Sequence, residues 1–202
     1  MQKYLKALYN IFRNYHLYSV PILIYEIIFQ FKYNSALNKF KYLDSDFLSD
    51  SIPCPYFFLK KIEKFIKKNK ISHACDLGSG YGKILYFLGI LNDNKIDGVE
   101  LEKEIYLESL NLQNRNIKIF NEDILKFDVN NTKYDLFILN DPLKKMENLH
   151  ELIIKIKKLY NQGYFIFINL NQEKIKCISE NLNMIDSFII SKNKNILFCS
   201  IE

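Results

Sequence analysis

The chain of 202 residues contains no tryptophan, four prolines and six glycines. Because Gly and Pro are scarce and 49% of the residues are hydrophobic, the sequence excludes a disordered, linker-rich or collagen-like protein. Its length suits one substantial domain with a short extension. We expect an extension over residues 1–50, with helices and a linker, and a main domain over residues 51–202.

Cysteine patterns typical of metal sites are also missing. Cys54, Cys75, Cys177 and Cys199 form no C-x-x-C pair and no metal-binding spacing with histidine. Cys75 and Cys199 lie in apolar runs and are expected as small core residues. We therefore expect no metal ion, a reducing compartment and a cytoplasmic location.

No apolar run is long enough for a membrane span. The apolar segment that follows Ser19 and Pro21 is interrupted by Glu26 and Gln30, whereas a span needs about 20 predominantly apolar residues. Ser19 can cap this second helix, and residues 2–18 form a basic, aromatic helical pattern without a signal-peptide cleavage site. The two helices are expected to pack on the main domain as a lid or dimer element, or to touch a membrane surface peripherally through residues 1–33.

Positive charge is concentrated in the front of the chain. Residues 1–75 carry 12 Lys and Arg against 5 Asp and Glu, whereas residues 76–202 carry 16 against 18. The basic front could face an anionic membrane, nucleic acid or an acidic partner, or be a solvated surface.

The stretch around residues 76–84 carries the most informative pattern in the sequence. An apolar run ends at Asp76-Leu77, glycines follow at 78, 80 and 82, and a helical pattern starts at Ile84. This pattern predicts a strand, a tight turn and a helix. Glycine allows positive φ and close approach of a ligand, and the helix directs free N–H groups at the turn. Such a turn suits a nucleotide-like or carboxylate-bearing ligand.

The spacing of the glycines narrows the range of ligands that the turn could bind. The dinucleotide fingerprint G-x-G-x-x-G would need glycine where Lys83 stands, and no P-loop motif is present. Asp76 would repel a pyrophosphate but could attract a sulfonium or ammonium cation. An NAD-dependent or nucleotide-sugar oxidoreductase is therefore the weaker alternative.

Strand and helix patterns alternate after residue 55, which predicts an α/β fold with a doubly wound, mostly parallel seven-stranded sheet. Only four residues separate the last two strands, so they must pair antiparallel. The predicted strands are 71–76, 96–100, 117–121, 134–140, 163–170, 184–190 and 195–201, and the predicted helices are 56–69, 83–91, 103–114, 144–160 and 172–182.

Polar residues follow the first four strands. They are Asp76, Glu100, Asp123 and the pair Asn140-Asp141. Because ligands bind at the carboxyl ends of strands in such sheets, we expect these groups to converge around the glycine turn. Glu100 lies roughly 20 residues after the first glycine, where an acid commonly accepts hydrogen bonds from ribose hydroxyls.

The stretch D-L-G-S-G-Y-G resembles motif I, D/E-x-G-x-G-x-G, of class I S-adenosylmethionine-dependent methyltransferases, whose sheet also closes with an antiparallel hairpin. The resemblance covers about residues 51–202. It implies S-adenosylmethionine as cofactor and S-adenosylhomocysteine as product, with an acid after the third strand at the adenine amino group and the next apolar residue against the ring. The cofactor-binding residues implied are Asp76, Gly78, Ser79, Gly80, Tyr81, Gly82, Glu100, Asp123, Ile124 and Asn140.

Within that superfamily the chain looks similar to small bacterial methyltransferases related to protein-lysine methyltransferases with a D-L-G-S-G-x-G-R motif. These place a Pro-x-Pro-Tyr-like segment before motif I, here ending in Tyr56, which implies that Tyr56 lies near the methionine end of the cofactor. Asp141 or Tyr56 could orient an amine acceptor. Lys83 and Tyr81 depart from the pattern, which leaves the substrate open.

The end of the fourth strand, Asn140-Asp141-Pro142-Leu143, is not the (D/N)-P-P-(Y/F) motif of nucleobase and glutamine methyltransferases. It could also be only a turn and helix cap. The expected activity is therefore methyl transfer to a protein lysine or a small molecule, with RNA methylation or a non-catalytic binding role as alternatives. Residues 38–54 are expected as a linker or an ordered loop that crosses the site. We expect residues 1–55 and the loop after Asn140 to build the acceptor pocket.

Overall fold

The computed structural model describes residues 9, 12–32, 39, 41–43, 49–129 and 132–201, without the side chains of residues 30–32. Its elements in chain order are η1 (His16–Tyr18), α2 (Ser19–Lys32), α3 (Tyr56–Asn69), β1 (His73–Leu77), α4 (Lys83–Leu85), η3 (Tyr86–Ile90), β2 (Lys95–Val99), α5 (Lys103–Ser109), η4 (Leu110–Leu112), β3 (Ile117–Phe120), β4 (Leu136–Leu139), α6 (Met146–Leu159), β5 (Gly163–Ile168), α7 (Gln172–Asn181), β6 (Asn183–Ser191) and β7 (Lys194–Ile201).

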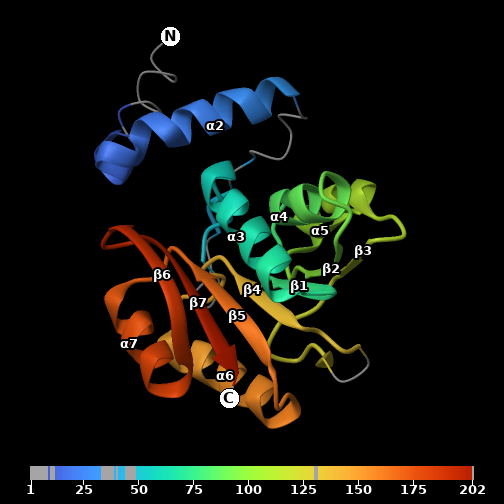
Figure 1. The fold of residues 1–202 in the computed structure, drawn as a ribbon. Coiled ribbons are helices and arrows are strands. Elements are labelled where there is room, and N and C mark those ends of the chain that lie inside the picture. Colours follow the sequence, from blue (N-terminus) through green and yellow to red (C-terminus); the bar gives the residue numbers. More distant parts are fainter. Residues whose placement is uncertain are drawn as a thin grey trace.

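The seven strands form one sheet in the order β3-β2-β1-β4-β5-β7-β6 (Figure 1). All neighbours from β3 to β5 pair in parallel, and β7 pairs antiparallel with both β5 and β6. The predicted doubly wound sheet with its closing hairpin is therefore confirmed. Each predicted strand begins and ends within two residues of the observed one.

Alternating apolar side chains give the sheet a core on each face, as expected for strands covered on both sides. In β4, Leu136 and Ile138 join the core under α3, whereas Phe137 and Leu139 join the core under α6. The 3.6-residue spacing of the apolar residues in α3 and α6 places their buried faces on the sheet. The carboxyl ends of β1 to β4 consequently meet at one edge of this layered fold.

Two of the predicted helices change type along their length. The predicted helix 83–91 is α-helical only to Leu85 and continues as the π-helix η3. The predicted helix 103–114 ends its α-helical part at Ser109 and closes with a 3-10 turn. Both shortened segments adjoin residues that line the cavity described below.

Helix α2 crosses the N-terminal end of α3 (Figure 1). It packs through Tyr25 and Phe29 against the core that α3 shares with the sheet. Ser19 is the first residue of α2, and its hydroxyl donates to the carbonyl of His16. Residues 2–8, 10 and 11 of the predicted first helix lie outside the described residues. None of the described helices is long and apolar enough to cross a bilayer.

Candidate functional site

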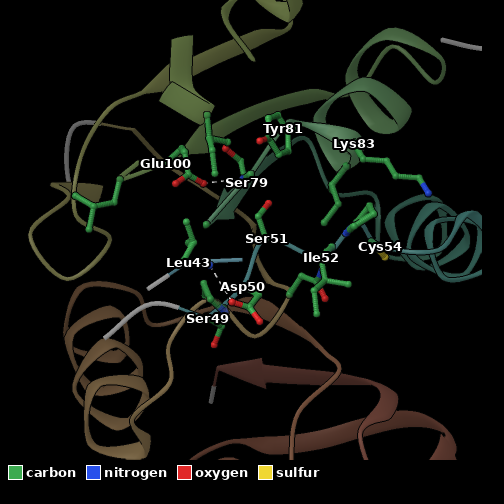
Figure 2. Close-up of a pocket in the computed structure, with 18 of the residues that line it drawn as sticks. Leu43, Ser49, Asp50, Ser51, Ile52, Cys54, Ser79, Tyr81, Lys83 and Glu100 are labelled. Atoms are coloured by element: carbon green, nitrogen blue, oxygen red, sulfur yellow. Dashed lines mark hydrogen bonds between the residues drawn. The ribbon is translucent and has the colours of Figure 1, made fainter. Parts of the chain in front are cut away.

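A cavity opens where β1 to β4 end (Figure 2). The residues that follow these strands line it: 78–81 after β1, Glu100 and Leu101 after β2, Asp123 and Ile124 after β3, and Asn140 and Pro142 after β4. Groups separated by more than 60 residues in sequence thus share one cavity. Of the polar residues at the ends of these strands, Glu100, Asp123 and Asn140 line the cavity, whereas Asp76 and Asp141 do not.

The turn after β1 forms the floor of the cavity. Gly78, Gly80 and Gly82 have φ values of 89°, 55° and 82°, a region that side-chain-bearing residues rarely adopt. The turn is anchored to β2, because the amides of Gly78 and Ser79 both donate to the carbonyl of Val99. A Cβ built on Gly78 would lie 2.4 Å from Cβ of Pro142, so the floor also fits tightly against the loop after β4.

Glu100 braces the floor from β2. It is 7% exposed; Oε2 accepts the Gly80 amide at 2.8 Å and Oε1 accepts the Glu102 amide at 2.8 Å. Burial raises the pKa of this carboxyl, against the lowering effect of the backbone donors. Each carboxylate oxygen has a second lone pair and can accept a further hydrogen bond.

Asp76 lies in the last part of β1, beneath the floor, and is not among the residues that line the cavity. It is fully buried, and neither carboxylate oxygen has a hydrogen-bond partner among the described residues. Burial, followed by the charge of Glu100, raises its pKa to about 8. An orphaned buried acid beside a cavity is a feature that structural packing alone does not explain.

Asp123 and Ile124 supply the wall after β3. The Oδ1 atom of Asp123 accepts the Leu125 amide at 3.0 Å, which fixes the turn. Ile124 is 5% exposed and also contributes to the core of the other sheet face. A carboxylate and an apolar side chain therefore lie next to each other at this wall.

The two predicted catalytic residues are not placed in the cavity. Asp141, whose φ is 45°, is not among the residues that line the cavity, and its carboxylate pairs with the buried ammonium of Lys174. Tyr56 is 1% exposed and stacks on Phe29, with 4.7 Å between ring centroids, because it begins α3 beneath α2. Tyr56 therefore does not line this cavity, and the position near a bound ligand that the resemblance implies for it stays a prediction.

Asn140 does line the cavity, but both ends of its amide have protein partners. Its Nδ2 donates to the carbonyl of Ile52 and its Oδ1 accepts from Nδ2 of Asn169, both at 2.8 Å. The Ile52 carbonyl can only accept a hydrogen bond, so Nδ2 of Asn140 must face it. These two hydrogen bonds therefore fix the orientation of the side-chain amides of Asn140 and Asn169. Asn140 thus holds neighbouring segments together at this end of the cavity.

Residues 49–54, here called the cover segment, lie across the cavity (Figure 2). The Ser49 amide donates to the Pro142 carbonyl at 3.1 Å, and Ser51 pairs with Lys41 in an isolated bridge. A Cβ built on Gly80 would lie 2.9 Å from Oγ of Ser51, so the cover segment rests directly on the floor. The alternative that residues 38–54 contain an ordered loop crossing the site is confirmed for the described part.

The sequence patterns did not single out which residues of this loop reach the cavity. Lys39, Leu43 and the whole cover segment contribute to the lining, without any motif of their own. Their polar composition was the available signal. The described residues contain no group of three or more side chains suited to hold a metal ion.

Comparisons of the sequence with known proteins assign this chain to no family. No family model matches the chain, and no curated protein matches it. Solved structures match in shape. Magnesium protoporphyrin IX methyltransferase of Synechocystis, solved with bound S-adenosylmethionine, has a TM-score of 0.57 at 14% identity over 72% of this chain and 79% of that one.

Two further methyltransferase structures match this chain in shape. The N-methyltransferase NodS of Bradyrhizobium japonicum has a TM-score of 0.57 at 13% identity, covering 72% of this chain and 93% of that one. An S-adenosylmethionine-dependent methyltransferase of Aquifex aeolicus has a TM-score of 0.55 at 13% identity, with coverages of 72% and 98%. This chain has the class I methyltransferase fold. Because the sequence identities are this low, the similarity of the chain to these methyltransferase structures establishes its fold alone.

Proposed function

We propose that this chain is an S-adenosylmethionine-dependent methyltransferase and that the cofactor binds in the cavity at the ends of β1 to β4. The observation that supports this most is the shared cavity of the glycine turn, Glu100 and Asp123. The fold brings these positions together, but it does not require glycines or carboxylates there.

The residues present fit the cofactor. The remaining lone pairs of Glu100 suit the two hydroxyls of a ribose, and the Asp123 carboxylate beside Ile124 suits a flat base with an exocyclic amine. A cationic ligand above the floor would stabilise the ionised form of the buried, partnerless Asp76 carboxyl, whereas a pyrophosphate would oppose its ionisation. We propose that the predicted residues 78–82 and Asn140 complete this site.

S-adenosylmethionine supplies a methyl group that is already activated on a sulfonium sulfur. The chain's part is then to hold the reactants in line and to keep water out, which is a large effect in principle. The glycine turn and Glu100 hold the floor, and the cover segment closes the cavity above it. An amine acceptor would have to lose a proton. Because Asp141 is held by Lys174, we propose that solvent takes this proton.

A direct test begins with the protein as purified. We expect mass spectrometry of its small-molecule extract to detect S-adenosylhomocysteine, and calorimetry to show binding of S-adenosylhomocysteine but not of NAD. Binding of NAD in preference to both sulfur nucleosides would contradict the proposal and favour the oxidoreductase alternative. Binding of the sulfur nucleosides without methyl transfer to any fraction would favour a non-catalytic binding subunit.

We propose a protein side chain, with lysine foremost, or a small molecule as the methyl acceptor. A transfer assay with tritiated S-adenosylmethionine on lysate fractions of protein, RNA and small molecules tests this. We expect label in the protein or small-molecule fraction. Label confined to RNA would overturn the acceptor class and would agree with the basic front of the chain.

We further propose that residues 1–33 contact an anionic membrane surface. In the described part of this segment, α2 leaves Val20, Ile24, Ile27 and Ile28 each about half exposed on one side. Its acidic residue, Glu26, faces inward to Lys83. We expect co-sedimentation with phosphatidylglycerol-containing vesicles and none with phosphatidylcholine alone. A concentration-dependent dimer without vesicle binding would instead assign this surface to a second copy.

A further inference from the structure

The side chain of Glu26 in helix α2 pairs with the residue that follows the glycine turn. The carboxylate of Glu26 accepts the backbone amide of Tyr56 on Oε1 at 2.6 Å and pairs through Oε2 with Nζ of Lys83 at 3.1 Å. Tyr56 begins α3, and Lys83 follows the last glycine of the turn. A single carboxylate therefore joins three elements, and its ion pair spans 57 residues of sequence.

Lys83 is enclosed at this junction. It is 5% exposed and lines the cavity, yet its ammonium points away from the cavity (Figure 2). The ammonium lies 4.0 Å from the centroid of the Tyr56 ring. Among the described residues, Glu26 is the only carboxylate within ion-pair distance of Lys83. The buried cation consequently depends on α2 for its counter-charge.

Losing this counter-charge has a specific consequence for the turn. A buried ammonium without a partner is costly, so it would either lose its proton or move toward water, and the movement would draw its backbone with it. That backbone directly follows Gly82, whose left-handed conformation ends the turn. Displacement of Lys83 would therefore displace the floor that is braced by Glu100.

We propose that Glu26 is a positioning residue for cofactor binding and that it acts through Lys83, which makes α2 a working part of the cofactor site. The inference rests on the proposed function. Glu26 does not line the cavity, so any effect on affinity must pass through the residues that it holds.

A double-mutant cycle tests whether Glu26 acts through Lys83. Glu26→Gln keeps an oxygen for the Tyr56 amide but removes the charge opposite Lys83, and Lys83→Met removes the ammonium. We expect Glu26→Gln to weaken S-adenosylhomocysteine binding by about tenfold in calorimetry. In the Lys83→Met background the same change should alter the Kd less than about twofold, because that variant has no buried ammonium that could lose its counter-charge.

The control is a second buried carboxylate with lysine partners. Glu63 in α3 is 6% exposed and bonds to Lys60 at 2.7 Å and Lys67 at 2.5 Å, away from the cavity. We expect Glu63→Gln to lower the unfolding midpoint while the Kd stays within about twofold of the wild type. If Glu26→Gln behaves like this control, or weakens binding equally in both backgrounds, the positioning role is wrong.

Hydrogen exchange of the ligand-free protein separates this inference from the proposed function. Peptides over residues 78–85 should exchange faster in Glu26→Gln and unchanged in Glu63→Gln. If wild-type protein binds no S-adenosylhomocysteine, the proposed function fails, but faster exchange would still show that Glu26 holds the turn. Should Glu26→Gln not fold, Glu26→Asp replaces it. Unchanged exchange and affinity in that variant, with a lowered unfolding midpoint, would overturn the inference.

Discussion

The floor and the cover of the cavity are built in different ways. The floor is a short stretch whose shape follows from three glycines and from bonds to the neighbouring strand β2. The cover segment has no such motif and is held by partners distant in sequence, including Asn140 and Pro142. The difference teaches that local backbone chemistry shapes the floor of the proposed site, whereas long-range contacts decide what encloses it. Substitutions in the floor should therefore have larger effects than substitutions in the cover.

The largest effect is expected in the floor, at Gly78. An alanine there would combine a φ of 89° with a Cβ only 2.4 Å from Cβ of Pro142. We expect Gly78→Ala to lower the free energy of unfolding by about 3 kcal/mol and to abolish detectable S-adenosylhomocysteine binding. Denaturant unfolding and calorimetry measure the two. As a matched change in the cover, Ser51→Ala should leave stability within about 0.5 kcal/mol, and equal effects of both would erase the distinction.

Asp76 should give the floor a characteristic pH dependence. Its folded pKa of about 8 lies above the value of 3.8 for an ordinary aspartate, so the folded protein binds the extra proton between these values. Raising the pH from about 4 to about 8 should therefore destabilise the wild type relative to Asp76→Asn, by at most about 1.4 kcal/mol per pH unit. Unfolding at pH 5.5, 7 and 8.5 tests this. Parallel curves for both proteins would contradict the raised pKa.

Glu100 links the floor to the proposed ligand. Glu100→Ala removes the acceptor of the Gly80 and Glu102 amides and the proposed ribose contact together. We expect an affinity loss for S-adenosylhomocysteine of about thirtyfold, or about 2 kcal/mol, by calorimetry. Glu100→Gln, which can still accept hydrogen bonds, should lose less. An affinity unchanged in Glu100→Ala would remove Glu100 from the site.

The smallest effect is expected at Lys41, which pairs with Ser51 of the cover segment. Its ammonium pairs with Glu104 at 2.7 Å, where the glutamate side chain is 82% exposed. Exposed ion pairs contribute little because solvent and salt screen them. We expect Lys41→Ala to leave both the unfolding midpoint and the affinity for S-adenosylhomocysteine unchanged. A clear loss of affinity would show that the ion pair latches the cover.

Most of the fold could be predicted from the sequence because its signals are local. Apolar runs indicated all seven strands, and the four residues between the last two predicted strands permitted only the antiparallel pair that β6 and β7 form. The glycine turn was equally visible, since strand, glycines and helix follow one another directly. The π-helix after Leu85 was not, because a change of helix type leaves no mark in the apolar spacing.

The site was predictable only in part, because some of its residues depend on tertiary contacts. The grouping of Glu100 and Asp123 follows from parallel strands ending at one edge. Asp141 follows the same pattern, yet it pairs with Lys174 and does not line the cavity. Tyr56 is buried by α2, and the contact of Glu26 with Lys83 joins residues that no sequence periodicity connects.

The central claim is that the strand-end acids and the glycine turn form one site for a sulfonium nucleoside. Calorimetric titration of the wild-type protein with S-adenosylhomocysteine, S-adenosylmethionine and NAD tests it most directly. We predict saturable one-to-one binding of both sulfur nucleosides, weakened by Glu100→Ala, and no binding of NAD. Binding of NAD alone, or sulfur-nucleoside binding that Glu100→Ala leaves unchanged, would contradict the claim.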